Sequence, residues 1–272
     1  MQPPDYLKIP ADELGHGHCV SVQIVPDAAR LAEQMAADIA DEIRAAAETG
    51  LPSTLIVPVG PVDQFPVLAR RLSAERISCR HVAFINMDEY LDDADAWLPV
   101  EHPLSFRGFM QRAFYDLLDS ALAPAAENRV FPDPRRPEAI GQLIERRGGV
   151  DACFGGIGIN GHLAFNEPPE PGETMTVEQF AALGTRVLSL ARETRTINAV
   201  TVGGEIGLVP RRAVTIGMRE ILAARRLRFY CNRPWQRSVV RRALHGPLTP
   251  ECPASLLRLH ADARLTITAE VA

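Results

Sequence analysis

Apolar residues recur along the chain at two spacings, which predict alternating helices and strands. Residues 26–50 carry an apolar residue at every fourth position, the pattern of a buried helix face, at Leu31, Met35, Ile39 and Ile43. Gly50 follows, where the end of a helix favours positive φ. Residues 53–59 are rich in residues that favour strands and are followed by Gly60-Pro61, which predicts a buried parallel strand.

The same two patterns continue to the end of the chain. A helix at 64–74 and a strand at 81–86 complete a βαβ unit with the strand at 53–59. We expect further helices at 103–122, 138–147, 218–224 and 235–245, and further strands at 150–157, 213–216, 227–231 and 265–268. This alternation predicts one α/β domain over residues 1–272, with a doubly wound, mostly parallel sheet and helices on both faces.

The composition argues against several classes of function. The formal net charge of -5 argues against a general nucleic-acid binder, which needs a cationic surplus for phosphates. No apolar run approaches about 18 residues and the first 14 residues lack a signal sequence, so we expect a cytoplasmic protein without a membrane partner. The five cysteines form no C-x-x-C pair, which disfavours a zinc or redox site. Lys8 is the only lysine, so a lysine Schiff base is not expected.

Asp88 lies directly after the predicted strand at 81–86, at the edge where ligands bind in parallel α/β sheets. A carboxylate at that position is partly desolvated, which raises its pKa towards that of a useful general base. A helix N-cap or an ion pair in a loop is an equally good interpretation from the residues alone.

A glycine-rich turn follows the strand at 150–157 and carries Asn160, Gly161 and His162. Tight glycine turns let the backbone approach a ligand closely, and histidine is the usual acid–base group near neutral pH. Glu167 lies near enough in sequence to bind the imidazole and fix its tautomer. A structural histidine, or a dinucleotide-binding loop, is the alternative. Because Asp88 and His162 both follow strand ends, we expect them in one site.

Three motifs in order resemble the glucosamine-6-phosphate deaminase (isomerase) family, which belongs to one superfamily with 6-phosphogluconolactonase. They are residues 84–90 (Phe-Ile-Asn-Met-Asp-Glu-Tyr), residues 102–110 (His-Pro-Leu-Ser-Phe through Phe-Met), and residues 158–168, with the string His-Leu-Ala-Phe-Asn-Glu-Pro. The Phe-Asn-Glu string favours the deaminase branch over the lactonase branch.

The resemblance implies a Rossmann-like sheet and an aldose–ketose isomerisation without a metal or organic cofactor. Asp88 resembles the base that moves a proton between C1 and C2 through an enol(amine). His162 resembles the group that protonates the ring oxygen and opens the pyranose, and Glu167 the carboxylate that orients it. Glu89 and Gly161 are expected to contact the substrate.

Three departures from the family pattern affect these implied roles. Asn160 stands where the family has Asp, and a neutral amide does not stabilise an imidazolium as a carboxylate does. The phosphate-binding loop reads Gly60-Pro61-Val62 here, without the hydroxyl groups of the family loop. The basic residues expected near the phosphate fall at Val200 and Gln236, so that their substitutes would be Arg195 or Arg233.

Three hypotheses follow, and in each of them the protein binds a small sugar. The first is an amino-sugar-phosphate isomerase and deaminase, which converts glucosamine 6-phosphate to fructose 6-phosphate and ammonia. The second keeps the isomerase chemistry on a non-phosphorylated or differently substituted sugar, because the phosphate loop is altered. The third is a non-catalytic sugar-binding relative. A homo-oligomer is possible under each hypothesis.

Overall fold

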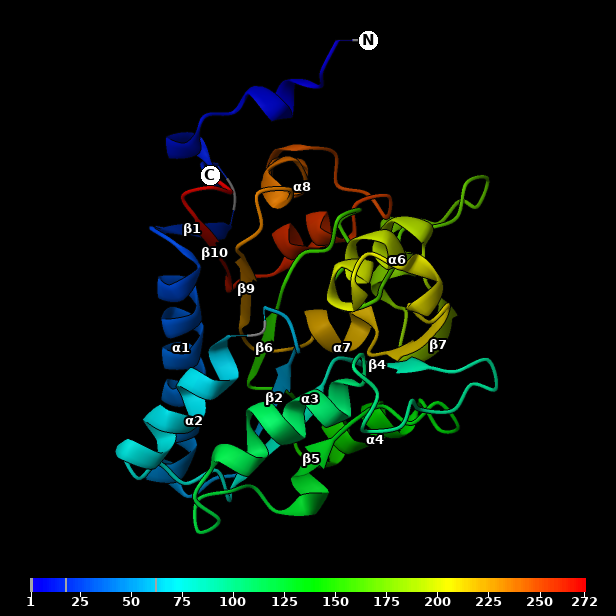
Figure 1. Cartoon of the computed structure of the whole chain (residues 1–272). Helices are drawn as coiled ribbons and strands as arrows, with labels where there is room; N and C mark the ends of the chain where they lie inside the picture. The colour runs from blue at the N-terminus through cyan, green and yellow to red at the C-terminus, as the bar shows by residue number, and fades with distance from the viewer. Residues whose placement is uncertain (1, 18, 62) are drawn as a thin grey trace.

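The computed structural model describes residues 2–17, 19–61 and 63–272. Its central sheet is entirely parallel and has the strand order β1-β10-β9-β6-β2-β3-β5 (Figure 1). The strands are β1 (Val20–Val25), β2 (Ser53–Val57), β3 (Val82–Asn86), β5 (Arg129–Val130), β6 (Ala152–Gly155), β9 (Leu227–Cys231) and β10 (Ala263–Thr268). Strands from both ends of the chain, β1 and β10, lie side by side.

Helices cover both faces of this sheet. The helices are α1 (Ala28–Thr49), α2 (Gln64–Ala74), α3 (Phe106–Ala113), α4 (Ala139–Arg146), α5 (Val177–Ala181), α6 (Arg192–Asn198), α7 (Met218–Leu222) and α8 (Gln236–His245). Of these, α1, α2 and α3 pack on one face and α4, α7 and α8 on the other. Seven short 3₁₀ segments join the described elements, at Asp5–Lys8, Ala11–Glu13, Tyr115–Leu117, Ala126–Asn128, Ala199–Val202, Ile206–Leu208 and Pro253–Leu259.

The alternation of side chains along β2 divides the core into two layers. Leu55 and Val57 point into the cluster formed with α1, α2 and α3, whereas Ile56 points into the cluster formed with α4, α7 and α8. A strand whose residues are all buried packs helices on both faces. The predicted doubly wound, mostly parallel α/β fold is therefore confirmed, and Gly50 ends α1 with a φ of 66° as its position predicted.

A second, three-stranded sheet is antiparallel, in the order β4-β8-β7. It consists of β4 (Asp88–Leu91), β7 (Arg186–Ser189) and β8 (Arg212–Thr215). The strand predicted at 213–216 lies in this sheet and not among the parallel strands. Met87 alone separates β3 from β4, so the chain leaves the main sheet and enters the second one at the candidate site.

The helix predicted over residues 103–122 ends at Ala113 instead. Phe114 and Tyr115 follow it directly, and both are buried. Phe114 leaves the helical conformation, with φ -131° and ψ -65°, and packs against Phe65 and Phe84.

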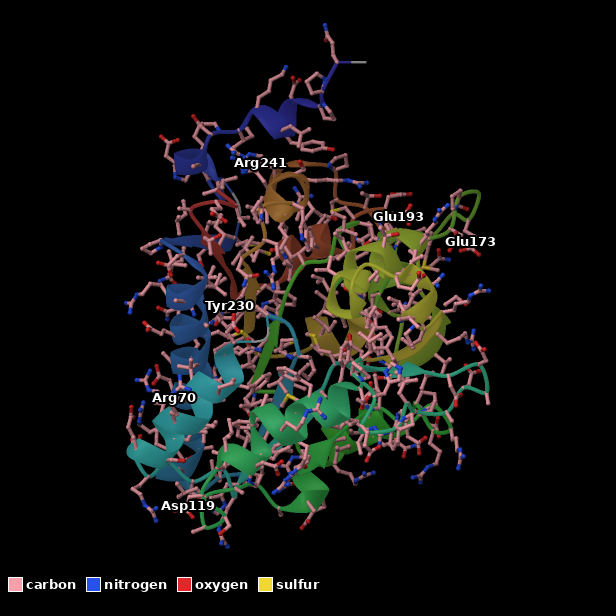
Figure 2. All side chains as sticks on the ribbon, viewed as in Figure 1. Arg70, Asp119, Glu173, Glu193, Tyr230 and Arg241 are labelled. Carbon is pink, nitrogen blue, oxygen red and sulfur yellow. The ribbon has the colours of Figure 1, made fainter. Side chains whose placement is uncertain are left out.

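Both ends of the chain pack against α8. The guanidinium of Arg241, which is only 3% exposed, donates hydrogen bonds to the carbonyls of Ile9 and Ala272, at 2.9 Å each (Figure 2). All five cysteines are free thiols, and only Cys19 among them is exposed. Within the described residues, no helix is long and apolar enough to cross a membrane.

Candidate functional site

Asp88 is the first residue of β4 and lies at the carboxyl ends of the parallel strands. Backbone hydrogen bonds on both sides of the chain fix its position there. The N–H of its neighbour Met87 donates to the carbonyl of Val57 on β2 (3.0 Å), and the carbonyl of Met87 accepts from the N–H of Ile216 (2.7 Å). Asp88 is only 7% exposed. Burial raises its pKa well above the ordinary value, and the charge of Glu89 raises it further. A carboxyl group in this environment suits proton abstraction.

Thr215 joins the segment that carries His162 to β4. It lies opposite Asp88 in the β4–β8 register, and its Oγ1 accepts a hydrogen bond from the N–H of Phe165 at 3.0 Å. The buried side chain of Asn166 donates to the carbonyl of Ile216, the residue after Thr215, at 2.9 Å. Strand β8 and the residue that follows it therefore connect the motif of Asp88 with the motif of His162.

A polar network surrounds Nδ1 of His162. Asn160 Oδ1 lies 2.9 Å from this nitrogen, Thr194 Oγ1 3.2 Å and Glu167 Oε2 3.3 Å. Asn160 also donates through Nδ2 to Glu167 Oε2 at 2.6 Å. The structure thus brings together His162, Asn160 and Glu167, which the sequence had singled out.

The contacts of Glu167 favour its charged form in spite of its burial. Burial raises its pKa, but the hydrogen bond and charge of His162, with the hydrogen bonds of Asn160 and Thr194, outweigh burial and lower the pKa. Its second oxygen accepts the N–H of Ala191 at 3.3 Å, at the start of α6. An anionic Glu167 stabilises positive charge on the neighbouring imidazole.

Thr194 was not identified from the sequence. It lies in the first turn of α6, more than 30 positions from His162, and is fully buried. Its place in the network depends on how α6 packs, and no local spacing indicates that. The Glu-Thr-Arg string at 193–195 was the only signal available.

Two glycines let the turn around His162 pack closely against its neighbours. Gly161 has a φ of +94°, and a Cβ on it would lie 2.8 Å from Cys252 Sγ. A Cβ on Gly158 would lie 2.0 Å from His162 Nε2. The glycine-rich turn therefore packs against the Cys252 segment on one side and presents the imidazole on the other.

We expect Gly158→Ala to lower kcat markedly, because the added methyl group must push the imidazole ring out of place. A displacement of about 1 Å in a catalytic group can cost on the order of 100-fold. Steady-state kinetics measures the loss, and circular dichroism at matched temperature checks the fold. Gly141→Ala is the matched control, since Gly141 lies in α4 and a Cβ there would make only ordinary contacts, at 3.5 Å or more. Equal kinetics for the Gly158→Ala and wild-type enzymes would contradict the placement of His162.

The side chain of Glu89 binds the N-terminus of α3, whereas the sequence led us to expect a contact with the substrate. Its carboxylate is fully buried, and Oε1 accepts the N–H groups of Tyr90 and Phe106 at 2.9 Å each. Oε2 accepts the N–H of Arg107 at 2.8 Å and the hydroxyl of Ser105 at 3.3 Å. These donors lie at the N-terminus of α3, where a negative charge is stabilising.

Replacing Glu89 by Gln is therefore expected to destabilise the fold by about 1–3 kcal/mol, because the amide NH₂ must face at least one backbone N–H donor in either orientation. Urea unfolding followed by circular dichroism measures the change in the free energy of unfolding. Glu127→Gln is the matched control, since Glu127 is exposed. An unchanged free energy of unfolding for Glu89→Gln would show that these hydrogen bonds contribute nothing.

The loop after β2 and the arginines near it form the remaining part of the predicted site. Gly60 is exposed and Pro61 half-buried, while Val62 lies outside the described residues. Arg195 already donates to the carbonyls of Ile206 (3.1 Å) and Val209 (3.3 Å). The side chain of Arg233 is exposed at the end of β9, and β9, β6 and β2 are neighbours in the sheet.

Gln236 occupies the position where the family pattern has a lysine, and it ties two of the site loops together. Its Nε2 donates to the carbonyl of Ile157 after β6, and its Oε1 accepts the N–H of Arg233, at 2.8 Å in both cases. The Arg233 loop is therefore fixed next to the glycine-rich turn, and Arg233 presents an exposed guanidinium there.

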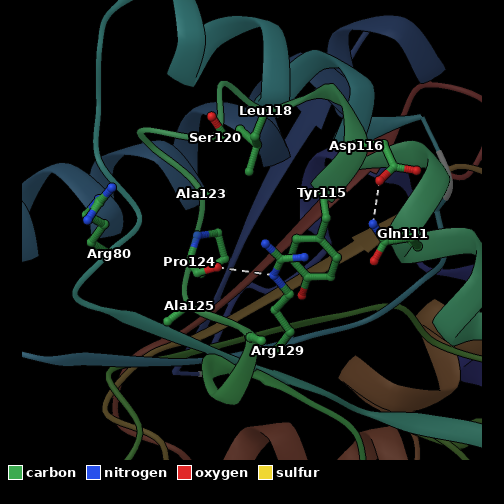
Figure 3. A pocket seen from close by; sticks show the side chains of 11 residues that line it. Arg80, Gln111, Tyr115, Asp116, Leu118, Ser120, Ala123, Pro124, Ala125 and Arg129 are labelled. Atoms are coloured by element: carbon green, nitrogen blue, oxygen red, sulfur yellow. Dashed lines mark hydrogen bonds between the residues drawn. The ribbon is translucent and has the colours of Figure 1, made fainter.

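A cavity of about 550 Å³ lies elsewhere (Figure 3). It is lined by residues of α3, the 3₁₀ segment at 115–117 and the start of β5, with Tyr115 beneath the guanidinium of Arg129. None of the candidate site residues lines it. Within the described part of the chain, no three His, Cys, Asp or Glu side chains meet as potential metal ligands.

Comparison with known proteins points to one family. The chain is similar to the glucosamine-6-phosphate deaminase of Porphyromonas gingivalis, with 32% identity over 244 residues that cover 87% of each protein. It is also 32% identical to that of Exiguobacterium sibiricum over 200 residues, 73% of this chain and 72% of that protein. No protein-family model matches the chain.

Solved structures agree with the sequence relatives. A monomeric glucosamine-6-phosphate deaminase superposes with a TM-score of 0.78 at 27% identity, covering 93% of this chain and 98% of the other. A 6-phosphogluconolactonase from Trypanosoma brucei superposes with a TM-score of 0.65 at 17% identity, over 94% and 98%. The second likeness shows the common fold, as the sequence resemblance implied.

Proposed function

Since the chain belongs to the glucosamine-6-phosphate deaminase family, we propose that it converts glucosamine 6-phosphate and water to fructose 6-phosphate and ammonia. Membership of this family makes it an enzyme, which argues against the non-catalytic hypothesis. The cytoplasmic location and a homo-oligomeric state stay predictions.

Two carboxyl groups whose environments shift their pKa in opposite directions carry this proposal. Burial raises the pKa of Asp88, whereas the contacts of Glu167 with His162, Asn160 and Thr194 lower its pKa against the effect of burial. Because their pKa values are shifted in opposite directions, two carboxyl groups in one site can act as a base and as a group that stabilises positive charge near pH 7. Asp88 is the base that moves the proton between C2 and C1, and Glu167 supports His162 during ring opening.

Arg233 is the residue that we propose for the phosphate. Its guanidinium is exposed beside the turn after β6, whereas two nitrogens of Arg195 already donate to backbone carbonyls. The backbone of Gly60 and Gly161 completes the proposed substrate contacts, and Pro61 offers no N–H. A single guanidinium can bind two phosphate oxygens in a forked geometry.

A panel of four sugars tests the reaction: glucose and glucosamine, each with and without a 6-phosphate, scored for ketose and for ammonia. The proposal predicts ammonia and ketose from glucosamine 6-phosphate. Turnover of unphosphorylated sugars alone would establish the second hypothesis instead. Arg233→Gln should raise KM for the phosphorylated sugar more than it lowers kcat, while Arg237→Gln, an exposed arginine on α8, should change neither.

A further inference from the structure

The cavity of about 550 Å³ beside β5 carries positive charge that the proposed sugar site does not use (Figure 3). Arg80, just before β3, and Arg129, the first residue of β5, both line it. Asp116 is the one acidic side chain among the described residues of its lining, and it accepts a hydrogen bond from Gln111. The lining thus has two positive charges against one negative, although the net charge of the whole chain is -5. A cavity with such a surplus attracts anions.

Both guanidinium groups are anchored through Nε to one loop. Arg80 Nε donates to the carbonyl of Ala121 at 2.9 Å, and Arg129 Nε donates to the carbonyl of Pro124 at 3.2 Å. A guanidinium has five N–H donors, and Nε supplies one of them. Among the residues that the structure describes, neither arginine forms an ion pair, and the donors on the terminal nitrogens have no acceptor. Two fixed guanidinium groups with free donors are preorganised for an anion.

Tyr115 fixes the plane of the Arg129 guanidinium. Cζ of Arg129 lies 4.6 Å from the centre of the Tyr115 ring, and Figure 3 shows the two side chains next to each other at the cavity. Such a contact uses the face of the guanidinium and leaves the N–H groups, which lie in its plane, for a ligand. Tyr115 is only 6% exposed, and burial raises the pKa of its hydroxyl. The phenol therefore stays neutral near pH 7 and does not itself act as the counter-ion.

We propose that this cavity binds a small organic phosphate, with the phosphate group on Arg129 and the organic part against residues 123–126. A phosphate group carries roughly two negative charges at pH 7, which match Arg80 and Arg129 together better than the single charge of a carboxylate. The planar donors of a guanidinium bind two phosphate oxygens at once. The wall at 123–126 reads Ala-Pro-Ala-Ala and so offers apolar surface to the organic part. The volume lies within the range of about 300–1,000 Å³ that is usual for small-molecule sites.

A ligand in this cavity should stabilise the edge of the main sheet. Strand β5 has only two residues, and one of them, Arg129, pairs with Phe84 of β3. A ligand that binds Arg129 in the folded protein therefore raises the free energy of unfolding, whether or not the enzyme acts on glucosamine 6-phosphate. The proposed sugar site is separate, because none of its residues lines the cavity.

Titration calorimetry with phenyl phosphate tests this site, since the probe has both a phosphate group and an apolar ring. The parent protein carries Arg233→Gln, which weakens binding of the probe at the proposed sugar site. Adding Arg129→Gln should weaken binding by roughly tenfold or more, the effect of losing a hydrogen bond to a charged group. Adding Arg135→Gln instead should change nothing, since Arg135 is exposed and lies outside the cavity. Equal affinity and stoichiometry with and without Arg129→Gln would overturn the proposal, even if Arg233 does not bind the substrate phosphate.

A second variant and a second probe separate loss of the site from loss of the fold. Ala126→Glu adds a carboxylate to an exposed part of the lining without removing a contact of Arg129, and it should also weaken binding of phenyl phosphate. Circular dichroism spectra that match the spectrum of the parent show that each variant is folded. Benzoate carries the same ring on a carboxylate, and tighter binding of benzoate than of phenyl phosphate would contradict the assignment of a phosphate.

Discussion

Replacing Asp88 by Asn is expected to lower kcat by roughly 10²–10⁴-fold, the usual contribution of a general base. The amide has nearly the same size and cannot accept a proton from carbon. Steady-state ammonia release measures the loss. In the wild-type enzyme, the acidic limb of kcat/KM reports ionisation of this base, and it should lie well above pH 3.8, the ordinary pKa of Asp, because burial raises the pKa of Asp88.

The same substitution should stabilise the protein at neutral pH. A carboxyl group whose pKa is raised by folding favours the folded state while it is protonated, and this contribution is lost as pH rises through the folded-state pKa. The Asn variant carries no charge there, so its Tm should exceed that of the wild type at pH 7.5. The difference should vanish below about pH 3.8. A lower Tm at pH 7.5 would mean that the lost activity reflects a damaged fold.

Replacing His162 by Gln is expected to have the second-largest effect, again roughly 10²–10⁴-fold in kcat. Ring opening needs a group that takes a proton from one oxygen and delivers it to another, and an amide does neither near neutral pH. His81→Gln, an exposed histidine before β3, is the matched control and should keep wild-type kinetics.

The Asp88 and His162 variants should be impaired at different steps of the reaction. Fructose 6-phosphate has an open-chain fraction, so the His162 variant should still exchange a C1 hydrogen with solvent deuterium when given this ketose, because Asp88 remains. The Asp88 variant should not exchange it. Equal loss of exchange in both variants would contradict the separate roles.

The sequence was most informative where strands are long and buried on both faces. Residues 53–57 and 82–86 are rich in apolar and β-branched residues, and both are strands of the main sheet. β4 and β7 were not predicted, because four residues are too few to show a period and their pairing is decided by β8. β1 was also missed, since an edge strand has half-exposed positions and no continuous apolar run.

The site followed the same rule. Asp88 comes two residues after β3 and His162 lies in the turn that follows β6, so their positions in the chain predict one site. Glu89 and Thr194 could not be assigned in this way, since one binds the start of α3 and the other comes from α6. Their roles depend on the packing of helices distant in sequence, which no local spacing encodes.

Deuterium exchange tests the central claim, that Asp88 moves the substrate proton, most directly. Fructose 6-phosphate and ammonium are incubated in D₂O with the wild-type and Asp88→Asn enzymes, and the C1 hydrogens are followed by proton NMR. The wild-type enzyme should exchange a C1 hydrogen, and the folded Asn variant should exchange it at least roughly 100-fold more slowly. Exchange at the wild-type rate in that variant would show that another group is the base.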